Sequence, residues 1–186
     1  LRHTTIDCQA SIDEFFLRHG RRDTTQTAQW RVDALRLLEM QRHALLMFTS
    51  CGWFFEEISR PEGVQILRYA ARAIELAADV SGALLESEFI HQLEQCPSNV
   101  EQFGNGAEVY RQLVISSRIS LEQVAAHYAI SSLFANYVRS QQLYCYTIEQ
   151  HDYQIQRMGS MTVAIGQIQI TSGITQESME YAFAVL

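Results

Sequence analysis

The residues of this chain that could do chemistry gather in one short stretch, TSCGWFFEE, at residues 49–57. Trp53 offers a broad flat face with one N–H donor, and such a face can stack on the apolar side of a sugar ring. Glu56 and its neighbour Glu57 could accept hydrogen bonds from the hydroxyl groups of that sugar. Aromatic residues also fill protein cores. The sequence therefore leaves two interpretations open: a sugar-binding edge, or an elbow whose aromatic side chains plug the core between two helices.

Cys51 lies in the same stretch and could act as a nucleophile if a base lay close to its thiol. The nearest histidine in the sequence, His43, would lie about 80° around an ideal helix from Cys51, which aims it poorly. A buried and inert thiol is the competing interpretation. We therefore predict no catalytic residue in this chain.

The sequence has no spacing that is typical of a metal site or a cofactor site. The cysteines Cys8, Cys51, Cys96 and Cys145 lie far apart and form no C-x-x-C pair. The histidines form no H-E-x-x-H motif, and the segment GNG at residues 104–106 is too short for a phosphate-binding loop. We predict neither a metal nor a cofactor.

The composition is that of a folded, acidic chain of 186 residues, with 47% hydrophobic residues and a formal net charge of −7. All 14 basic residues are arginine and they are scattered, so we expect no surface for nucleic acid. Apolar runs such as ALLMF at residues 44–48 are far shorter than the ~18 residues of a membrane span, and no signal peptide is recognisable. Dispersed thiols favour a reducing compartment. We therefore predict a soluble, cytoplasmic protein with no membrane partner.

Hydrophobic periodicity predicts helices up to about residue 134. A long helix begins at Gln29, and its polar face disappears at residues 45–48, which is typical of a helix end surrounded by protein. Because TSCGWFFEE follows at once, we expect this elbow to lie deep or to face a cleft. Ser59 and Glu62 predict a capping box for the next helix, with Pro61 in its first turn.

Later signals end that helix and begin another. Ser81 and Gly82 are typical of a helix end, and Ser120 with Gln123 predicts a second capping box. From about residue 140 the period changes to two, which predicts the strands LYCYTIEQ, DYQIQRM and SMTVAIGQIQIT, with turns at EQHD and GS. In the third strand the apolar residues move from odd to even positions at Gly166, which predicts a β-bulge there. A final strand or short helix should follow TSGIT.

These patterns predict an α+β fold: a bundle of about five or six helices at residues 1–139, followed by a small antiparallel β-sheet at residues 140–186. The chain opens without a methionine and closes on EYAFAVL, which is typical of a strand that is cut short. We therefore expect one fragment of a larger polypeptide.

The segment LLEMQRHALLMFTSCGWFFEEISRPEGVQILRYAARAIELA, residues 37–77, resembles a known family. This family is glycoside hydrolase family 57, which contains α-amylase-like and α-mannosidase-like proteins, in the subgroup that carries the domain of unknown function numbered 3536. LEQVAAHYAISSLF and GQIQITSGIT are similar to the same subgroup. The resemblance spans most of the chain.

The resemblance implies a place in a larger enzyme. Family 57 enzymes are retaining glycosidases whose two catalytic carboxylates lie in an amino-terminal incomplete (β/α) barrel, and none of the motifs of that barrel occurs here. The helical region after the barrel reaches the active site with a motif of the form S-D-W-x-F, whose tryptophan borders the sugar subsites. SCGWFF is similar to that motif, so the sugar contact would fall to Trp53. Gly52 stands where the motif has aspartate.

Two hypotheses follow. In the first, the chain is the non-catalytic region after the barrel of a family-57-like enzyme that acts on α-glycans. It supports that barrel, its partner in the same polypeptide, and hydrolyses nothing alone. The predicted substrate-binding residues are Trp53, Phe54, Glu56 and Cys51. In the second hypothesis, the chain is a module for domain docking or oligomerisation that contacts no carbohydrate.

Overall fold

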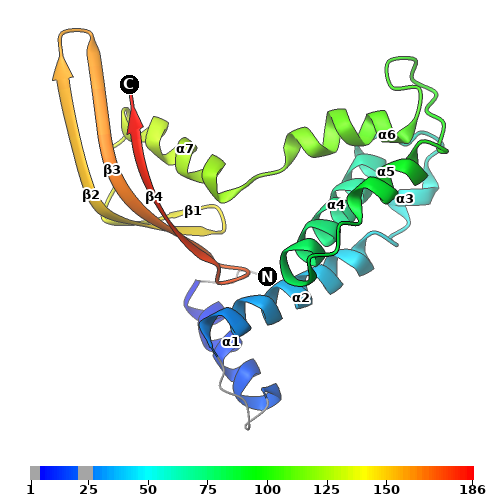
Figure 1. Ribbon diagram of the computed structural model, residues 1–186, viewed down its shortest axis with the longest axis horizontal. Helices are drawn as coiled ribbons and strands as arrows, with labels where there is room; N and C mark the ends of the chain where they lie inside the picture. Colours follow the sequence, from blue (N-terminus) through cyan, green and yellow to red (C-terminus); the bar gives the residue numbers. More distant parts are fainter. Residues whose placement is uncertain (1–4, 21–26) are drawn as a thin grey trace. The chain divides into compact units, whose positions relative to one another are not determined.

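The computed structural model describes residues 5–20 and 27–186, with side chains described at residues 11–20, 27–50 and 52–186. The α+β class is confirmed, because the described residues form seven α-helices and a four-stranded antiparallel sheet (Figure 1). The chain divides into two compact units, which we name the sheet unit, residues up to Val32 together with Ser120–Leu186, and the helical unit, Asp33–Ile119. The predicted regions 1–139 and 140–186 follow secondary structure, whereas these units follow packing.

The amino-terminal part of the sheet unit contains α1, Thr5–His19, and the first turn of α2, Ala28–Leu46. Phe16 is the buried residue that joins them, since its ring centroid lies 5.4 Å from that of Trp30. The guanidinium of Arg31 lies 4.9 Å from the centre of the Phe16 ring and also pairs with Asp13. The contact between these two tilted rings and the cation above Phe16 hold the two helix segments together.

The sheet has the strand order β1-β2-β3-β4, with every neighbour antiparallel. Its strands are β1, Ser140–Leu143; β2, Tyr146–Met158; β3, Met161–Ser172; and β4, Ser178–Val185. One face is covered by α7, Leu121–Ser132, and the apolar stripe of this helix packs on the buried isoleucines of β2 and β3. The buried members of this core are Val124, Ala125, Tyr128, Ile148, Ile168 and Ile170.

Two predictions about the strands are wrong: the turn at EQHD and the β-bulge at Gly166. EQHD does not form a turn, because it lies within the continuous strand β2. The turn lies before β2, where Tyr144 has a φ of 55°. The irregularity within EQHD is a β-bulge at the register shift between Gln150 and Asp152. There is no register shift at Gly166, whose place in β3 is regular. The β-bulge therefore lies in β2, and not in β3 where it was predicted.

Gly166 is required for a different reason, which is close packing. A Cβ atom at this position would lie 2.8 Å from the backbone oxygen of Asp152 and 2.8 Å from Cζ of Phe183. Ala164, Gly166 and Ile168 are all buried, so β3 presents one continuous face to the core while Ile165 points to the other side. Small residues at the even positions make room for the Phe183 ring, and no change of face is needed.

The helical unit is built around α4, Pro61–Ser81, which has proline in its first turn and a buried stripe at helical spacing. The stripe packs against α5, Glu86–Leu93; α6, Gly106–Val109; and a π-helical turn, Tyr110–Val114, that continues into a 3₁₀ turn, Ile115–Ser117. The remaining helix, α3, is a single turn at Cys51–Phe54. The buried residues of this core are Val64, Leu67, Ala71, Leu93, Ala107, Val109, Tyr110 and Val114.

The helix boundaries test three of the sequence signals. The capping box of Ser120 and Gln123 is confirmed, with both reciprocal hydrogen bonds present. Gly82 ends α4 in the left-handed conformation, and its N–H donates to the Ala78 carbonyl at 2.8 Å. The capping box of Ser59 and Glu62 is wrong, because Arg60 is the N-cap of α4 and has no side-chain capping bond.

Candidate functional site

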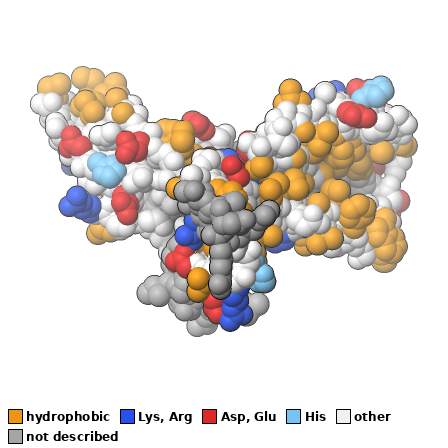
Figure 2. All heavy atoms as spheres, turned by 60° about the horizontal axis from the view of Figure 1, so that its bottom comes forward, with side chains coloured by type: hydrophobic (Ala, Val, Ile, Leu, Met, Phe, Trp, Pro, Cys, Tyr) orange, Lys and Arg blue, Asp and Glu red, His pale blue; other side chains and the backbone are white. Residues whose placement is uncertain are grey.

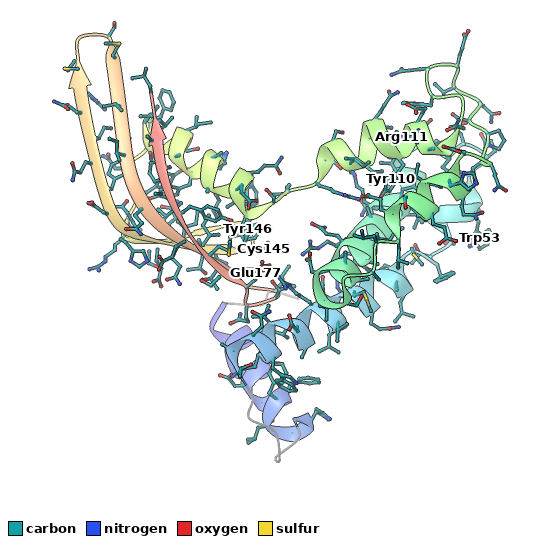
Figure 3. The ribbon with its side chains drawn as sticks, viewed as in Figure 1. Trp53, Tyr110, Arg111, Cys145, Tyr146 and Glu177 are labelled. Atoms are coloured by element: carbon teal, nitrogen blue, oxygen red, sulfur yellow. The ribbon has the colours of Figure 1, made fainter. Side chains whose placement is uncertain are left out.

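The TSCGWFFEE elbow leaves its aromatic side chains on the surface of the helical unit. Trp53 is 74% exposed and Phe54 is 70% exposed, and Phe48, at the end of the preceding helical segment, is 77% exposed. Trp53 projects outward from α3 (Figure 3). Of the three aromatics in the stretch, Phe55 alone is half-buried, beneath the Arg60 guanidinium at 4.5 Å. The interpretation in which these side chains plug a core therefore does not apply to Trp53 or Phe54.

Gly52 fixes α3 against α4. A Cβ atom at Gly52 would lie 3.2 Å from Cγ1 and 3.3 Å from Cγ2 of Ile66, which is closer than most such contacts. Glycine thus lets the α3 backbone approach the Ile66 side chain, and Trp53 extends from this supported turn. An aspartate here, as in the S-D-W-x-F motif, would need Ile66 to move by a few tenths of an ångström.

Glu57 anchors the end of the elbow rather than facing solvent. Its carboxylate accepts hydrogen bonds from the Ser59 N–H at 2.9 Å, the Ser98 hydroxyl at 2.7 Å and the Asn99 N–H at 2.6 Å. These donors lower the pKa of Glu57 to about 2, because they stabilise the charged form. This contact could not be predicted from residue spacing, since Ser98 and Asn99 lie far from Glu57 along the chain. Glu57 has a structural role, which leaves Glu56 as the exposed acid of the stretch.

The backbone of Cys51 begins α3, but its side chain lies outside the described residues. Its predicted place in the site therefore stays a prediction. Cys96 and Cys145 carry exposed, free thiols.

A polar network lies on α2 before the elbow. Arg42 Nε donates to Glu39 Oε2 at 2.9 Å, and His43 Nε2 lies 3.2 Å from Glu39 Oε1. The His43 ring lies 5.7 Å from that of Tyr69 on α4. Burial and the Arg42 charge lower the pKa of His43, and the Arg42 hydrogen bonds lower that of Glu39. The His43 ring joins this network on α2 to Tyr69 on α4.

A second network, which we did not predict, surrounds the π-helical turn. The buried Tyr110 hydroxyl donates to Glu86 Oε1 at 2.9 Å and accepts from Arg118 Nη2 at 2.8 Å, while Arg118 also pairs with Glu86. Burial raises the pKa of Tyr110, and the Arg118 hydrogen bond lowers that of Glu86. A π-helical turn carrying a buried tyrosine cannot be recognised from residue spacing. The Tyr110 hydroxyl and the Glu86 carboxylate both have partners within the network, and Arg118 bonds them through Nη2 while its Nε is buried without a partner.

The elbow carries groups that could contact a ligand. The elbow presents an aromatic face beside the exposed carboxylate of Glu56, and its other carboxylate, Glu57, is already occupied by hydrogen bonds. Within residues 5–20 and 27–186, no group of three or more His, Cys, Asp or Glu side chains is arranged to hold a metal ion. No helix in the same part of the chain is long and apolar enough to cross a membrane.

Comparisons with known proteins give one match. Searches of curated proteins and of solved structures found none. A family model described as "Domain of unknown function (DUF3536)" matches residues 4–186. Because this match covers nearly the whole sequence, the chain belongs to the DUF3536 family.

Proposed function

We propose that this chain is the region after the catalytic barrel of a glycoside hydrolase that resembles family 57 and acts on α-glycans. In this proposal the chain supports the barrel and brings Trp53 to the edge of the substrate cleft. The observation that carries the proposal is the exposure of Trp53, 74%, on a helical turn that Gly52 holds against Ile66. The similarity of SCGWFF to the sugar-contacting motif of family 57 supports it.

The chemistry of the elbow fits a sugar ligand. The axial C–H groups of a pyranose ring form an apolar surface that stacks on an indole, and such aromatic contacts contribute about 0.5–1.5 kcal/mol beyond the area that they bury. Phe54 extends the aromatic surface, and the exposed Glu56 carboxylate can accept hydrogen bonds from sugar hydroxyls. Since no acid–base pair of carboxylates accompanies these groups, the chain would bind substrate while the barrel cleaves it.

The test uses the full polypeptide that carries this chain, with malto-oligosaccharides as substrates. Trp53→Ala should lower kcat/KM about twofold to tenfold, which corresponds to the loss of one aromatic contact. Phe48→Ala is the matched control, because Phe48 is equally exposed and lies outside the SCGWFF motif. If both variants keep the wild-type kcat/KM on every α-glycan tested, Trp53 contacts no substrate and the proposal is wrong.

A second candidate function, a docking module without carbohydrate contact, is favoured by the exposed apolar residues before the elbow. Leu45 and Phe48 are both exposed on the last turns leading to α3. In a docking module, Phe48→Ala and Trp53→Ala would weaken association with the neighbouring domain alike. In the glycan-binding region, Trp53→Ala alone changes sugar binding. Isothermal titration of the full polypeptide with maltoheptaose separates these two outcomes.

A further inference from the structure

The helical unit contains an apolar groove of about 420 Å³ between α2, α4 and α5. Figure 2 shows hydrophobic side chains gathered on one face of this unit. None of the residues that line the groove belongs to the TSCGWFFEE elbow, so the groove is separate from the proposed glycan contact. Its lining consists of Met40, Ala44, Met47, Ala70, Ala73, Ile74, Ala77, Leu85, Glu88, Phe89 and Gln92.

Three helices line the groove, and no fourth helix covers it in the part of the chain that the structure describes. On α4 the lining residues stand at positions i, i+3, i+4 and i+7 from Ala70, and the residues from Leu85 along α5 repeat the same spacing. On α2 they stand at i, i+4 and i+7 from Met40. Each helix therefore turns one complete stripe toward the groove, which is the arrangement that receives the apolar face of a further helix.

The side chains of the groove suit close approach by a helix. Alanines form most of the α4 contribution, and small residues there let another backbone come near. Met40 and Met47 form the α2 wall, and methionine adapts its shape to irregular apolar partners. Phe89 on α5 offers a flat apolar surface, so a helix could bury leucine-sized side chains against all three walls.

One charge breaks the apolar lining, and it has no counterion among the described residues. Glu88 is exposed on α5 and makes no ion pair or hydrogen bond with any residue in the part of the chain that the structure describes. The other two glutamates near it on the chain are both engaged: Glu86 with Arg118, and Glu94 with His91 and Arg111. A carboxylate that stands alone at the rim of an apolar groove complements a basic group on the occupant.

We propose that this groove binds an amphipathic helix of a partner protein, with apolar residues at i, i+3 or i+4, and i+7, and with a lysine or arginine that pairs with Glu88. The apolar stripe supplies affinity and the basic residue fixes the register of the helix in the groove.

The test measures fluorescence anisotropy of two labelled synthetic helices of about 15 residues, long enough to form a helix when bound. Both peptides carry leucine at i, i+3, i+4 and i+7 on an alanine and glutamine background; one has arginine beside the stripe and its twin has glutamate there. The arginine peptide should bind the whole chain about fivefold more tightly than its twin, which is the size expected of a partly exposed ion pair. Glu88→Arg should reverse the preference.

Three further variants complete the test. Ala77→Leu fills the floor of the groove and should abolish binding of both peptides, with Ala44→Leu as a second filler if circular dichroism shows that the first disturbs the fold. Glu101→Arg makes the same charge change at an exposed residue outside the lining and should leave the preference unchanged. Three results would overturn the helix assignment. They are equal binding of both peptides, a preference that Glu88→Arg does not reverse, and binding of dodecyltrimethylammonium that displaces both peptides. A concentration-dependent dimer that Ala77→Leu abolishes would overturn it in favour of a second copy.

Discussion

Tyr128 of the sheet unit and Trp53 of the helical unit use their aromatic rings in opposite ways. In the sheet unit, Tyr128 is 2% exposed, stacks on Tyr137 at 4.8 Å, and donates its hydroxyl hydrogen to Gln150 Oε1 at 2.9 Å. In the helical unit, Trp53 is 74% exposed. Its backbone is held closely while its ring is left open to solvent.

This difference separates aromatics that stabilise the fold from those that are available for contact. A buried ring with a satisfied hydroxyl contributes both apolar burial and a hydrogen bond to folding. An exposed ring contributes little to folding, and a cluster of exposed apolar side chains marks a contact surface. On this basis Tyr128 stabilises the fold, whereas the elbow is the surface for which we propose a role in recognition.

The sharpest test of the comparison is to remove one ring from each unit. Tyr128→Ala should lower the free energy of unfolding by about 3–5 kcal/mol, because it leaves a cavity and an unpaired Gln150 oxygen. Trp53→Ala should change it by no more than about 0.5 kcal/mol, as is usual for an exposed residue. Urea unfolding followed by circular dichroism measures both. A large loss in Trp53→Ala would break the comparison, since it would show that the elbow aromatics stabilise the folded chain.

Alanine at a glycine of each unit gives the next largest effect. Gly166→Ala should destabilise the chain by about 1–3 kcal/mol, because its Cβ would meet a backbone oxygen and the Phe183 ring at 2.8 Å. Gly52→Ala meets only the flexible Ile66 side chain, at 3.2 Å, and gains the better helix propensity of alanine, so its stability should stay within about 0.5 kcal/mol. Thermal unfolding of both variants tests this. Equal destabilisation would mean that the elbow is packed as tightly as the sheet.

The smallest effect is a dependence on pH that belongs to the elbow. The pKa of Glu57 falls from an ordinary value of 4.5 to about 2 in the folded chain. Its carboxylate therefore stabilises the fold above about pH 4.5, and this contribution disappears as the pH falls toward about 2, because the unfolded chain takes up the proton first. Glu57→Gln should lack this part of the acid-induced loss of stability.

Urea titrations of Glu57→Gln and wild type across that pH range provide the measurement. Glu56→Gln is the matched control, since Glu56 is exposed and makes none of these three bonds. Parallel stability curves for wild type and Glu57→Gln would contradict the anchoring role of Glu57.

The predicted capping boxes formed only where no other residue took their hydrogen-bonding groups. The capping box of Ser120 and Gln123 formed as expected, since both residues lie beside an apolar helix that begins immediately. The capping box of Ser59 and Glu62 failed because Glu57 takes the Ser59 N–H and turns toward Ser98, far along the chain. A different local acceptor, Glu57, replaced Glu62, and Glu57 is held in place by the distant Ser98, a contact that sequence spacing does not reveal.

Residue types in TSCGWFFEE indicated the candidate site, but they did not predict how exposed its side chains are. The disappearing polar face at residues 45–48 predicted that the elbow lies deep or faces a cleft, and in the described chain Phe48 and Trp53 are both exposed. Periodicity reports how apolar a helix face is and does not report whether another element covers it.

The sequence by itself determined the α+β class, the start of α2, the carboxyl-terminal end of α4 and the strand-rich carboxyl-terminal region, because each depends on hydrophobic period or on residues adjacent in the chain. Only the tertiary structure decided three further features: the bulge in EQHD, the Glu86–Tyr110–Arg118 network and the open groove at Glu88. Each of these joins elements that are distant in sequence. Their geometry depends on how whole helices and strands pack, which residue spacing alone does not encode.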